Sequence, residues 1–277
     1  MHEVRPQVFF VAETRMVEAC PNAVGGVEIG LENYLHEVGG QNWRTDAPSD
    51  AEKLIEAGGK LCYRSWEPGL NPNVEKVRQG NAKYIGHVIE VGHGSVIEHA
   101  SASFIFHNVS RVFTHELVRH RAGTAMSQES MRFVRLDDIP FWIPDADPGL
   151  LSEEQKAQEA ACFKAAADDA EAAMHELEAI YGLDKPGLPF DVKKKLTSRM
   201  RRLVPDGVGT GILWTANIRS IRHLLEMRTA PGAEEEIRLV FGMVGRFAKI
   251  RWPNLFADYT EEVVDGQPWF KTERRKV

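Results

Sequence analysis

The feature that most constrains the fold is an alanine-rich run over residues 152–181 that contains neither glycine nor proline. Ser152 and Gln155 form the Ser-x-x-Gln pattern of a helix capping box, and Gly182 is a typical C-terminal stop. A single helix over this run would be about 45 Å long, which exceeds the width of a small domain. We therefore expect it to project from the body of the protein or to pack along a neighbouring subunit.

Elsewhere the hydropathy pattern changes between the helical and the strand period, which indicates a chain with both element types. Val8 to Val11 and the alternating run 100–108, in which Ala102, Phe104 and Phe106 share one face, are expected to be strands. Helices are expected over 50–63 with Asp50 as N-cap, 81–91 before Gly92, 110–120 with Ser110 as N-cap, 191–203, 212–227 and 233–250. The expected fold class is α/β of the α+β type, with long helices flanking a small mixed sheet.

Length and composition fit one domain. The 277 residues are 43% hydrophobic, so a single core is expected across 1–277, with 1–49 as a peripheral N-terminal extension and 254–277 as a C-terminal tail. The net charge of -6 argues against nucleic-acid or membrane partners, so any bound anion requires a local arginine cluster. Three widely spaced cysteines and an N-terminus without a signal-peptide layout indicate a cytoplasmic protein.

The segment from His87 to Arg135 concentrates the residues suited to chemistry. Within it, Arg119-His120-Arg121 is followed by AGTAMSQE and then by Ser130-Met131-Arg132. Three adjacent basic residues are most often a solvated helix end, where they complement the helix dipole. Here, however, hydroxyl side chains follow the arginines and the polar turn HGSVIEH, residues 93–99, precedes them. Guanidinium groups beside hydroxyls are what a nucleotide phosphate or a flavin diphosphate requires.

Taken together, these blocks resemble the signature of the flavin-dependent thymidylate synthases, the ThyX family. RHRAGTAMSQESMR resembles the family's Arg-His-Arg, spacer and Ser-x-Arg series, and HGSVIEH resembles its His-Gly-x-Thr/Ser-x-x-Glu-His segment. Further along, Asn217-Ile218-Arg219, His223 and Arg228 resemble its Asn-x-Arg, His/Asn and Arg series, and Arg201 keeps the family's offset from Asn217. The resemblance covers roughly residues 57–250, and it implies a homotetrameric flavoprotein architecture.

The resemblance implies two sets of binding residues. The expected FAD-binding set, with His93 and Glu98 beside it, is Ser95, Arg119, His120, Arg121, Gln128, Asn217, Ile218, Arg219 and His223. The expected nucleotide-binding set, which the resemblance places between two subunits, is Glu116, Arg119, Gln128, Glu129, Ser130, Met131, Arg132, Arg201 and Arg228. Arg228 is the expected catalytic residue, which grips the uracil edge and stabilises negative charge as C5 becomes nucleophilic. The co-substrate 5,10-methylenetetrahydrofolate would supply the carbon, and NADPH would reduce the flavin.

Two departures from the family pattern concern the nucleotide site. The spacer between Arg-His-Arg and Ser-x-Arg usually has seven residues, whereas this chain has eight, Ala122 to Glu129, so a bulge is expected beside the ribose and base. Glu116 stands where relatives often carry glutamine, which adds a carboxylate near a bound phosphate. The expected substrate is dUMP, and the alternative is UMP, since relatives in nucleoside-antibiotic pathways methylate the ribonucleotide. For Arg201 the alternative is a solvated helix face.

Other classes of function fit these residues less well. A zinc hydrolase would need ligands at helical spacing, but His93 and His99 are six apart and no His-Glu-x-x-His motif occurs, so no metal is expected. An RNA-binding module is disfavoured by the acidic composition and the lack of an aromatic platform. Cys20, Cys62 and Cys162 stand in contexts unlike that of a cysteine-dependent thymidylate synthase, and burial is the expected reason for Cys62 and Cys162.

Overall fold

The centre of the protein is a four-stranded antiparallel sheet. The computed structural model describes residues 1–131, 138–144, 149, 151–275 and 277. The strands lie in the order β2 (Gln7–Glu13), β5 (Ser101–Ser110), β8 (Gly209–Asn217) and β6 (Thr124–Gln128). The α+β class is therefore confirmed, but the expected mixed sheet is antiparallel throughout. Its edge strand β2 comes from the stretch expected to be peripheral, and the strand expected over Val8 to Val11 is confirmed.

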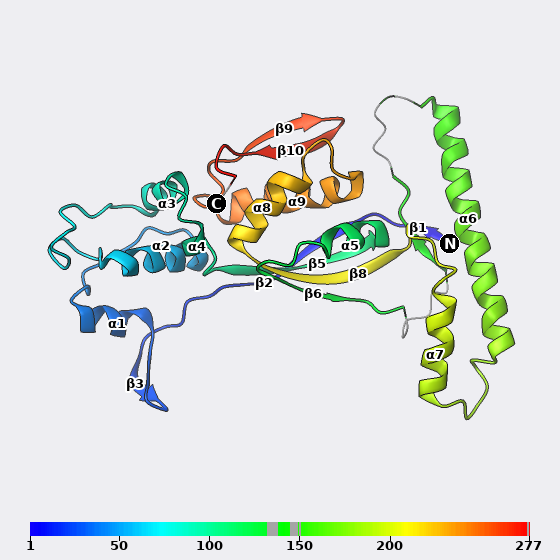
Figure 1. Cartoon of the computed structure of the whole chain (residues 1–277), viewed down its shortest axis with the longest axis horizontal. Helices are drawn as coiled ribbons and strands as arrows, with labels where there is room; N and C mark the ends of the chain where they lie inside the picture. The colour runs from blue at the N-terminus through cyan, green and yellow to red at the C-terminus, as the bar shows by residue number, and fades with distance from the viewer. Residues whose placement is uncertain (132–137, 145–148, 150, 276) are drawn as a thin grey trace.

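One face of the sheet carries the helical layer (Figure 1). That layer consists of α5 (Arg111–Leu117), α8 (Ile218–Arg228) and α9 (Glu235–Arg251). The strand period points Phe104, Phe106 and Trp214 into this layer, where they form the core with the apolar residues of the helices. A hairpin of β9 (Thr260–Val264) and β10 (Gln267–Lys271) covers α9 on its far side.

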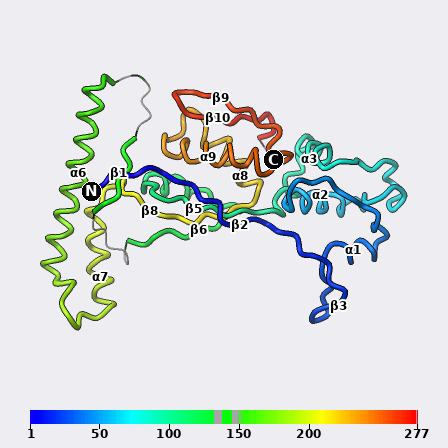
Figure 2. Tube along the Cα trace, turned by 180° about the vertical axis from the view of Figure 1, so that it is seen from behind, coloured from blue at the N-terminus to red at the C-terminus, as the bar shows by residue number. Residues whose placement is uncertain are grey.

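Two further groups of elements extend the sheet in opposite directions (Figure 2). At one end lie β3 (Cys20–Val24), β4 (Val27–Ile29), α1 (Leu31–Val38), α2 (Asp50–Tyr63), α3 (Asn81–Glu90) and α4 (Gly94–Ile97). At the other end lie the parallel pair β1 (His2–Glu3) and β7 (Pro140–Phe141) with α6 (Glu153–Tyr181) and α7 (Phe190–Met200). We call α6 and α7 together the arm.

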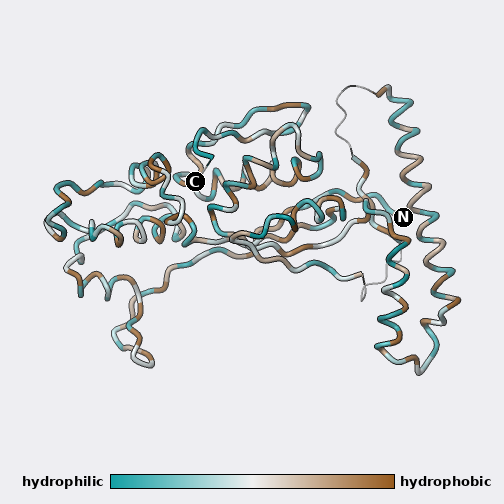
Figure 3. The backbone as a smooth tube through the Cα atoms, viewed as in Figure 1, coloured by the Kyte–Doolittle hydropathy of each residue, from teal (hydrophilic) through white to brown (hydrophobic). Residues whose placement is uncertain are grey.

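The helix α6 confirms the strongest sequence expectation. Ser152 and Gln155 form the capping box, and Gly182 ends the helix in the left-handed conformation. Only Ala167 and Met174 of its residues are buried, so the helix projects from the body. Hydrophilic and hydrophobic residues alternate along it without a long hydrophobic stretch (Figure 3). Within the described ranges no helix combines the length and the apolar character that crossing a bilayer requires.

Several expectations about element boundaries are wrong, including the end of the helix expected over 191–203, which the structure places at Met200. The helix expected over 212–227 begins only at Ile218, because Ile212, Trp214 and Ala216 alternate as the buried face of strand β8. Ser49 rather than Asp50 caps α2, since the Ser49 hydroxyl accepts from the Glu52 amide. The helix expected to reach residue 120 ends at Leu117, although Ser110 caps it as expected.

Candidate functional site

A cavity of about 830 Å³ lies where the segment after α5 meets the start of α8. We call it the first cavity. Its lining includes six residues of the expected FAD-binding set and the neighbouring carboxylate, namely Arg119, His120, Arg121, Asn217, Arg219, His223 and Glu98. The segment that precedes β6 and the segment that follows β8 are thus brought to one site. Ser95 lies exposed on α4 outside this lining, and Ile218 is fully buried in the core.

A tight turn at Gly123 joins the two sides of the first cavity. The Asn217 amide donates to the Gly123 carbonyl at 3.0 Å, and the Ser220 hydroxyl donates to the Ala122 carbonyl at 2.8 Å. Gly123 has a φ of 68°, and an added Cβ would overlap the side chains of Asn217 and Ser220. The turn therefore fixes the Arg119–Arg121 segment against the N-cap of α8.

The expected bulge in the longer spacer is absent from the described strand. The pairing of β6 with β8 runs from Thr124 to Gln128 without a register shift. Glu129 continues the pairing, because its amide donates to the Gly211 carbonyl at 2.9 Å. The spacer is a turn followed by a regular strand, so the prediction of a bulge beside the base is wrong.

A second close approach places Arg219 at the mouth of the first cavity. Its Nη1 donates to Glu98 Oε1 at 2.6 Å. An added Cβ on Gly94 would lie 2.7 Å from the Arg219 Cζ and Nε atoms. The glycine of the HGSVIEH segment therefore leaves room for the guanidinium, and the glutamate of the same segment orients it.

Behind the first cavity, Arg228 is held by two residues of α5 and the segment that follows. Its Nε donates to His120 Nε2 at 2.7 Å, and its Nη1 lies 2.7 Å from Glu116 Oε2. Burial and the adjacent Arg228 guanidinium lower the pKa of His120 to about 4. His120 is therefore neutral at pH 7 and accepts a hydrogen bond from Arg228, while Glu116 balances the arginine's charge.

A second cavity, of about 540 Å³, lies between the end of β6, α5 and the loop after α7. Five residues of the expected nucleotide-binding set line it, namely Gln128, Glu129, Ser130, Met131 and Arg201. Arg132, from the same set, lies outside the described residues. Arg119 and Arg228, also assigned to the nucleotide, do not line the second cavity, and Gln128, also assigned to FAD, does not line the first.

The second cavity also contains residues that the sequence analysis missed. Arg111 and His115 lie one helical turn apart on α5, and both line the cavity with Arg202 and Asp206. Both residues could have been predicted from the sequence. They are four residues apart in a helix that Ser110 caps, and this spacing places both side chains on one face of the helix. Glu129 has a different environment from that expected, since its carboxylate accepts from the Gly211 amide at 2.8 Å.

The cysteines are placed differently from the expectation. Cys62 and Cys162 are both exposed, so burial explains neither of them. Cys62 donates only a weak hydrogen bond, at 3.4 Å, to the Gly58 carbonyl of its own helix. Among the residues that the structure describes, no group of three or more histidine, cysteine or acidic side chains is arranged to hold a metal ion.

Comparisons with known proteins give consistent results. A family model described as thymidylate synthase complementing protein (Thy1) matches residues 45–254. A flavin-dependent thymidylate synthase of Mycobacterium sp. (strain JLS) is 38% identical over 224 residues, covering 78% of this chain and 83% of the relative. The corresponding enzyme of Mycobacterium avium (strain 104) is 38% identical over 220 residues, covering 78% and 82%.

A solved structure supports the fold. A UMP/dUMP methylase PolB from Streptomyces cacaoi, bound with 5-Br UMP, is similar with a TM-score of 0.61. The match covers 92% of this chain and 94% of that chain, at 16% sequence identity. At that identity the similarity concerns the arrangement of the chain and not the choice of nucleotide.

Proposed function

Because the chain belongs to the flavin-dependent thymidylate synthase family, we propose that it methylates the C5 carbon of dUMP to give dTMP, with FAD as cofactor. The co-substrates are 5,10-methylenetetrahydrofolate, which supplies the carbon, and NADPH, which supplies the electrons. The observation that carries this proposal is the first cavity. There the turn at Ala122 meets Ser220, 98 residues further along the chain, so that two separate sequence blocks share one site.

The side chains of the first cavity fit a flavin dinucleotide. A volume of about 830 Å³ lies within the range of cofactor and ligand sites. Arg119, Arg121 and Arg219 supply guanidinium donors for a diphosphate, and Glu98 is the only acidic side chain among the lining residues. Gly94 and Gly123 let backbone and guanidinium groups approach closely. When bound, the reduced flavin would supply the hydride for the transfer.

The nucleotide is assigned to the second cavity, and Arg228 is assigned to its uracil ring. Arg201 and Arg111 provide the positive charge for its phosphate, in a protein whose net charge is negative. Arg228 stabilises the negative charge that develops on the uracil ring, which removes the need for a cysteine nucleophile. Glu116 and neutral His120 orient Arg228, and Glu129 holds the end of β6 against β8.

A homotetramer with sites shared between subunits is part of the same proposal. The sheet face opposite the helical layer is left uncovered by the chain (Figure 1). Phe9, Val11, Ile105 and Leu213 are exposed there by 48%, 49%, 37% and 39%. An apolar face of this kind favours contact between copies of the chain. Sedimentation should give the mass of four chains, and replacing Phe9 and Leu213 with lysine should lower it. A wild-type monomer would overturn the shared-site proposal.

The activity is tested with purified protein and both candidate nucleotides. The protein should bind FAD and show flavin absorbance. It should then convert dUMP to dTMP when methylenetetrahydrofolate and NADPH are present. Competing dUMP with UMP in one reaction, and measuring both methylated products, tests the substrate. We expect dTMP to predominate. A clear excess of 5-methyl-UMP would contradict dUMP as the substrate, and protein that binds no FAD would contradict the cofactor.

A further inference from the structure

The last residues of the chain form a wall of the first cavity. Arg275 and Val277 line it together with the Arg119–Arg121 turn and the start of α8. Both residues lie after β10 and beyond residue 254, where the match to the family model ends. We call residues 272–275 and 277 the tail. No motif in the sequence analysis assigned a role to this part of the chain.

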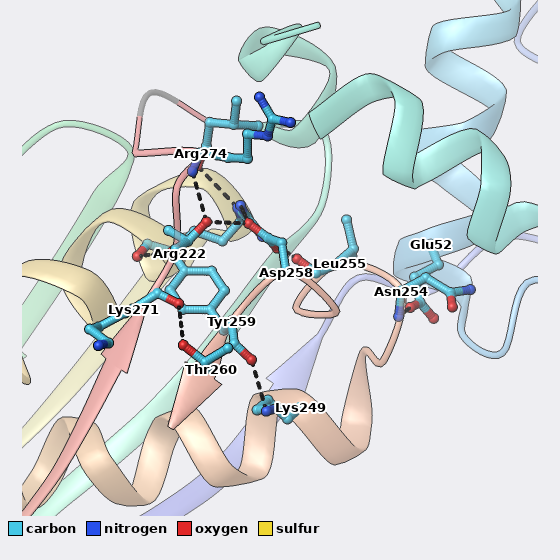
Figure 4. A network of polar contacts seen from close by, with 12 residues as sticks. Glu52, Arg222, Lys249, Asn254, Leu255, Asp258, Tyr259, Thr260, Lys271 and Arg274 are labelled. Atoms are coloured by element: carbon cyan, nitrogen blue, oxygen red, sulfur yellow. Dashed lines mark hydrogen bonds and ion pairs between the residues drawn. The ribbon is translucent and has the colours of Figure 1, made fainter. Parts of the chain in front are cut away.

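A fully buried arginine of α8 holds the tail in place. Arg222 Nε donates to the Val277 carbonyl at 3.0 Å, and its two Nη atoms lie 2.8 Å from the carboxylate oxygens of Asp258. The Thr272 hydroxyl donates to the same carboxylate at 2.5 Å and accepts from the Arg274 amide at 2.9 Å. Figure 4 shows Arg222, Asp258 and Arg274 within this network. The position of the tail is therefore set by buried polar contacts.

Arg222 and the cavity residues lie on different faces of the same helix. Arg219 and His223 line the first cavity, whereas Arg222 is fully buried and binds the tail. Glu226, one turn after Arg222, lies 3.3 Å from the Nε atom of Arg275. The helix that carries the expected cofactor residues thus also orients the tail arginine.

Arg275 retains the capacity to bind an anion in the cavity. A guanidinium has five N–H donors, and the contact with Glu226 engages the Nε atom. The side chain is 72% exposed, so the Nη donors reach solvent. With Arg119, Arg121 and Arg219 it makes four arginines in a lining whose one acidic side chain is Glu98. Such an excess of forked donors suits the oxyanions of a diphosphate.

We propose that Arg275 binds a phosphate oxygen of the FAD diphosphate, and that Arg222 is a positioning residue that keeps Arg275 at the cavity by anchoring the tail. This inference rests on the proposed function, because it takes FAD as the ligand of the first cavity. It adds a residue from outside the matched family region to the cofactor site. It also gives a reason for the contact between the fully buried guanidinium of Arg222 and the Val277 carbonyl.

The test compares Arg275→Gln with a control from the same tail. Arg274→Gln removes the same charge one residue earlier, at a side chain that does not line the cavity. Binding is measured by the quenching of flavin fluorescence, with FAD and with riboflavin, which has no phosphate. We expect Arg275→Gln to weaken FAD binding roughly tenfold and to leave riboflavin binding unchanged. The loss should shrink at high salt, because the arginine is exposed.

A second variant tests the anchoring. Thr272→Val removes the hydroxyl that links the tail to Asp258, and it touches no cavity residue. It should weaken FAD binding by a similar factor, again without affecting riboflavin. The double variant Thr272→Val with Arg275→Gln should bind FAD no more weakly than Arg275→Gln alone, because Thr272 acts on FAD only by positioning the guanidinium that the second change removes.

The outcomes separate this inference from the proposed function. Unchanged FAD binding in Arg275→Gln would overturn the inference alone, and so would an equal loss in Arg274→Gln or an equal loss of riboflavin binding. Additive losses in the double variant would overturn the claim that the contacts of Arg222, Asp258 and Thr272 act on FAD through the position of Arg275. A wild-type protein that binds neither FAD nor riboflavin would overturn the proposed function, and the inference with it.

Discussion

The two cavities differ in how firmly the chain holds their walls. The first is built on α8, whose Ile221, Leu224 and Leu225 are buried in the main core, and it is closed by the tail that Arg222 anchors. The second lies at the junction between that core and the arm, where α7 buries only Thr197 and Met200. A wall backed by a packed core has little freedom to move. We infer that the first cavity is preformed, whereas the shape of the second cavity depends on where the arm lies.

The largest expected effect concerns a buried contact at the start of α5, the helix whose Arg111 and His115 line the second cavity. Buried Glu236 accepts from the amide of Ser110, at 2.7 Å, and from its hydroxyl, at the start of α5. Burial raises the pKa of Glu236 to about 7. The folded state therefore favours the neutral carboxyl, and the stability that this group contributes is complete below its ordinary pKa and is lost as the pH rises through 7.

We expect the free energy of unfolding to fall by roughly 3 kcal/mol between pH 4.5 and pH 8 on account of Glu236. Glu236→Gln, which stays neutral, should remove that part of the pH dependence. Glu159→Gln, at an exposed position of α6, should leave it unchanged. Urea unfolding across this pH range provides the measurement. Identical pH profiles for wild type and Glu236→Gln would show that folding does not change the pKa of this carboxyl.

The next effect concerns the rate of the methylation step that is proposed to depend on Arg228. Arg228→Ala removes the guanidinium assigned to the uracil ring, and the loss of one such donor typically lowers the rate on the order of a hundredfold. FAD binding should persist, because Arg228 does not line the first cavity. Turnover is measured at saturating dUMP and flavin absorbance in the same samples, which separates an effect on the rate from an effect on FAD binding. Full activity in this variant would remove Arg228 from the mechanism.

Glu116→Gln is the matched control for Arg228. It keeps an acceptor for the Nη1 atom of Arg228 and removes only the charge that balances the guanidinium. Since the geometry is preserved, we expect a change in rate far smaller than that of Arg228→Ala. A loss as large as that of Arg228→Ala would assign the catalytic role to the carboxylate instead.

A smaller effect is expected in the second cavity. Arg201→Ala should weaken dUMP binding by roughly 1.5–3 kcal/mol, the usual loss for a charged hydrogen-bond partner, and should leave FAD binding unchanged. Arg199→Ala is the control, since Arg199 lies on the exposed face of α7 and does not line the cavity. Calorimetry with dUMP measures the difference. Equal affinity in wild type and Arg201→Ala would support the solvated-face interpretation of Arg201.

The sequence could predict the parts of the fold that depend on local pattern. The capping box of α6 and the Ser110 cap of α5 depend on residues three apart, so both were predictable. The strand β8 was missed because Ile212, Trp214 and Ala216 alternate immediately before the helical residues of α8, and a window across the junction averages the two periods. A strand followed directly by a helix is where periodicity is least informative.

The site could be predicted only where its residues belong to motifs. The convergence of Arg119–Arg121 with Asn217–His223 followed from the family resemblance, and the structure places them around one cavity. The spacer expectation was wrong because the number of residues between two motifs does not say which of them turn; here Gly123 turns and β6 stays regular. Arg222 and Arg275 belong to no motif, and only the folded chain brings the tail to α8.

The smallest expected effect is the replacement of all three cysteines. A cysteine nucleophile needs a thiolate stabilised by neighbouring cations and positioned beside the substrate. Neither cavity has a cysteine among its described lining residues, and Cys62 and Cys162 lie exposed on α2 and α6. A variant with Cys20→Ser, Cys62→Ser and Cys162→Ala should therefore keep wild-type turnover. Activity is compared with flavin content and thermal unfolding in the same samples. If turnover is lost while the protein remains folded and loaded with flavin, a thiol takes part in the reaction, and the role given to Arg228 must be revised.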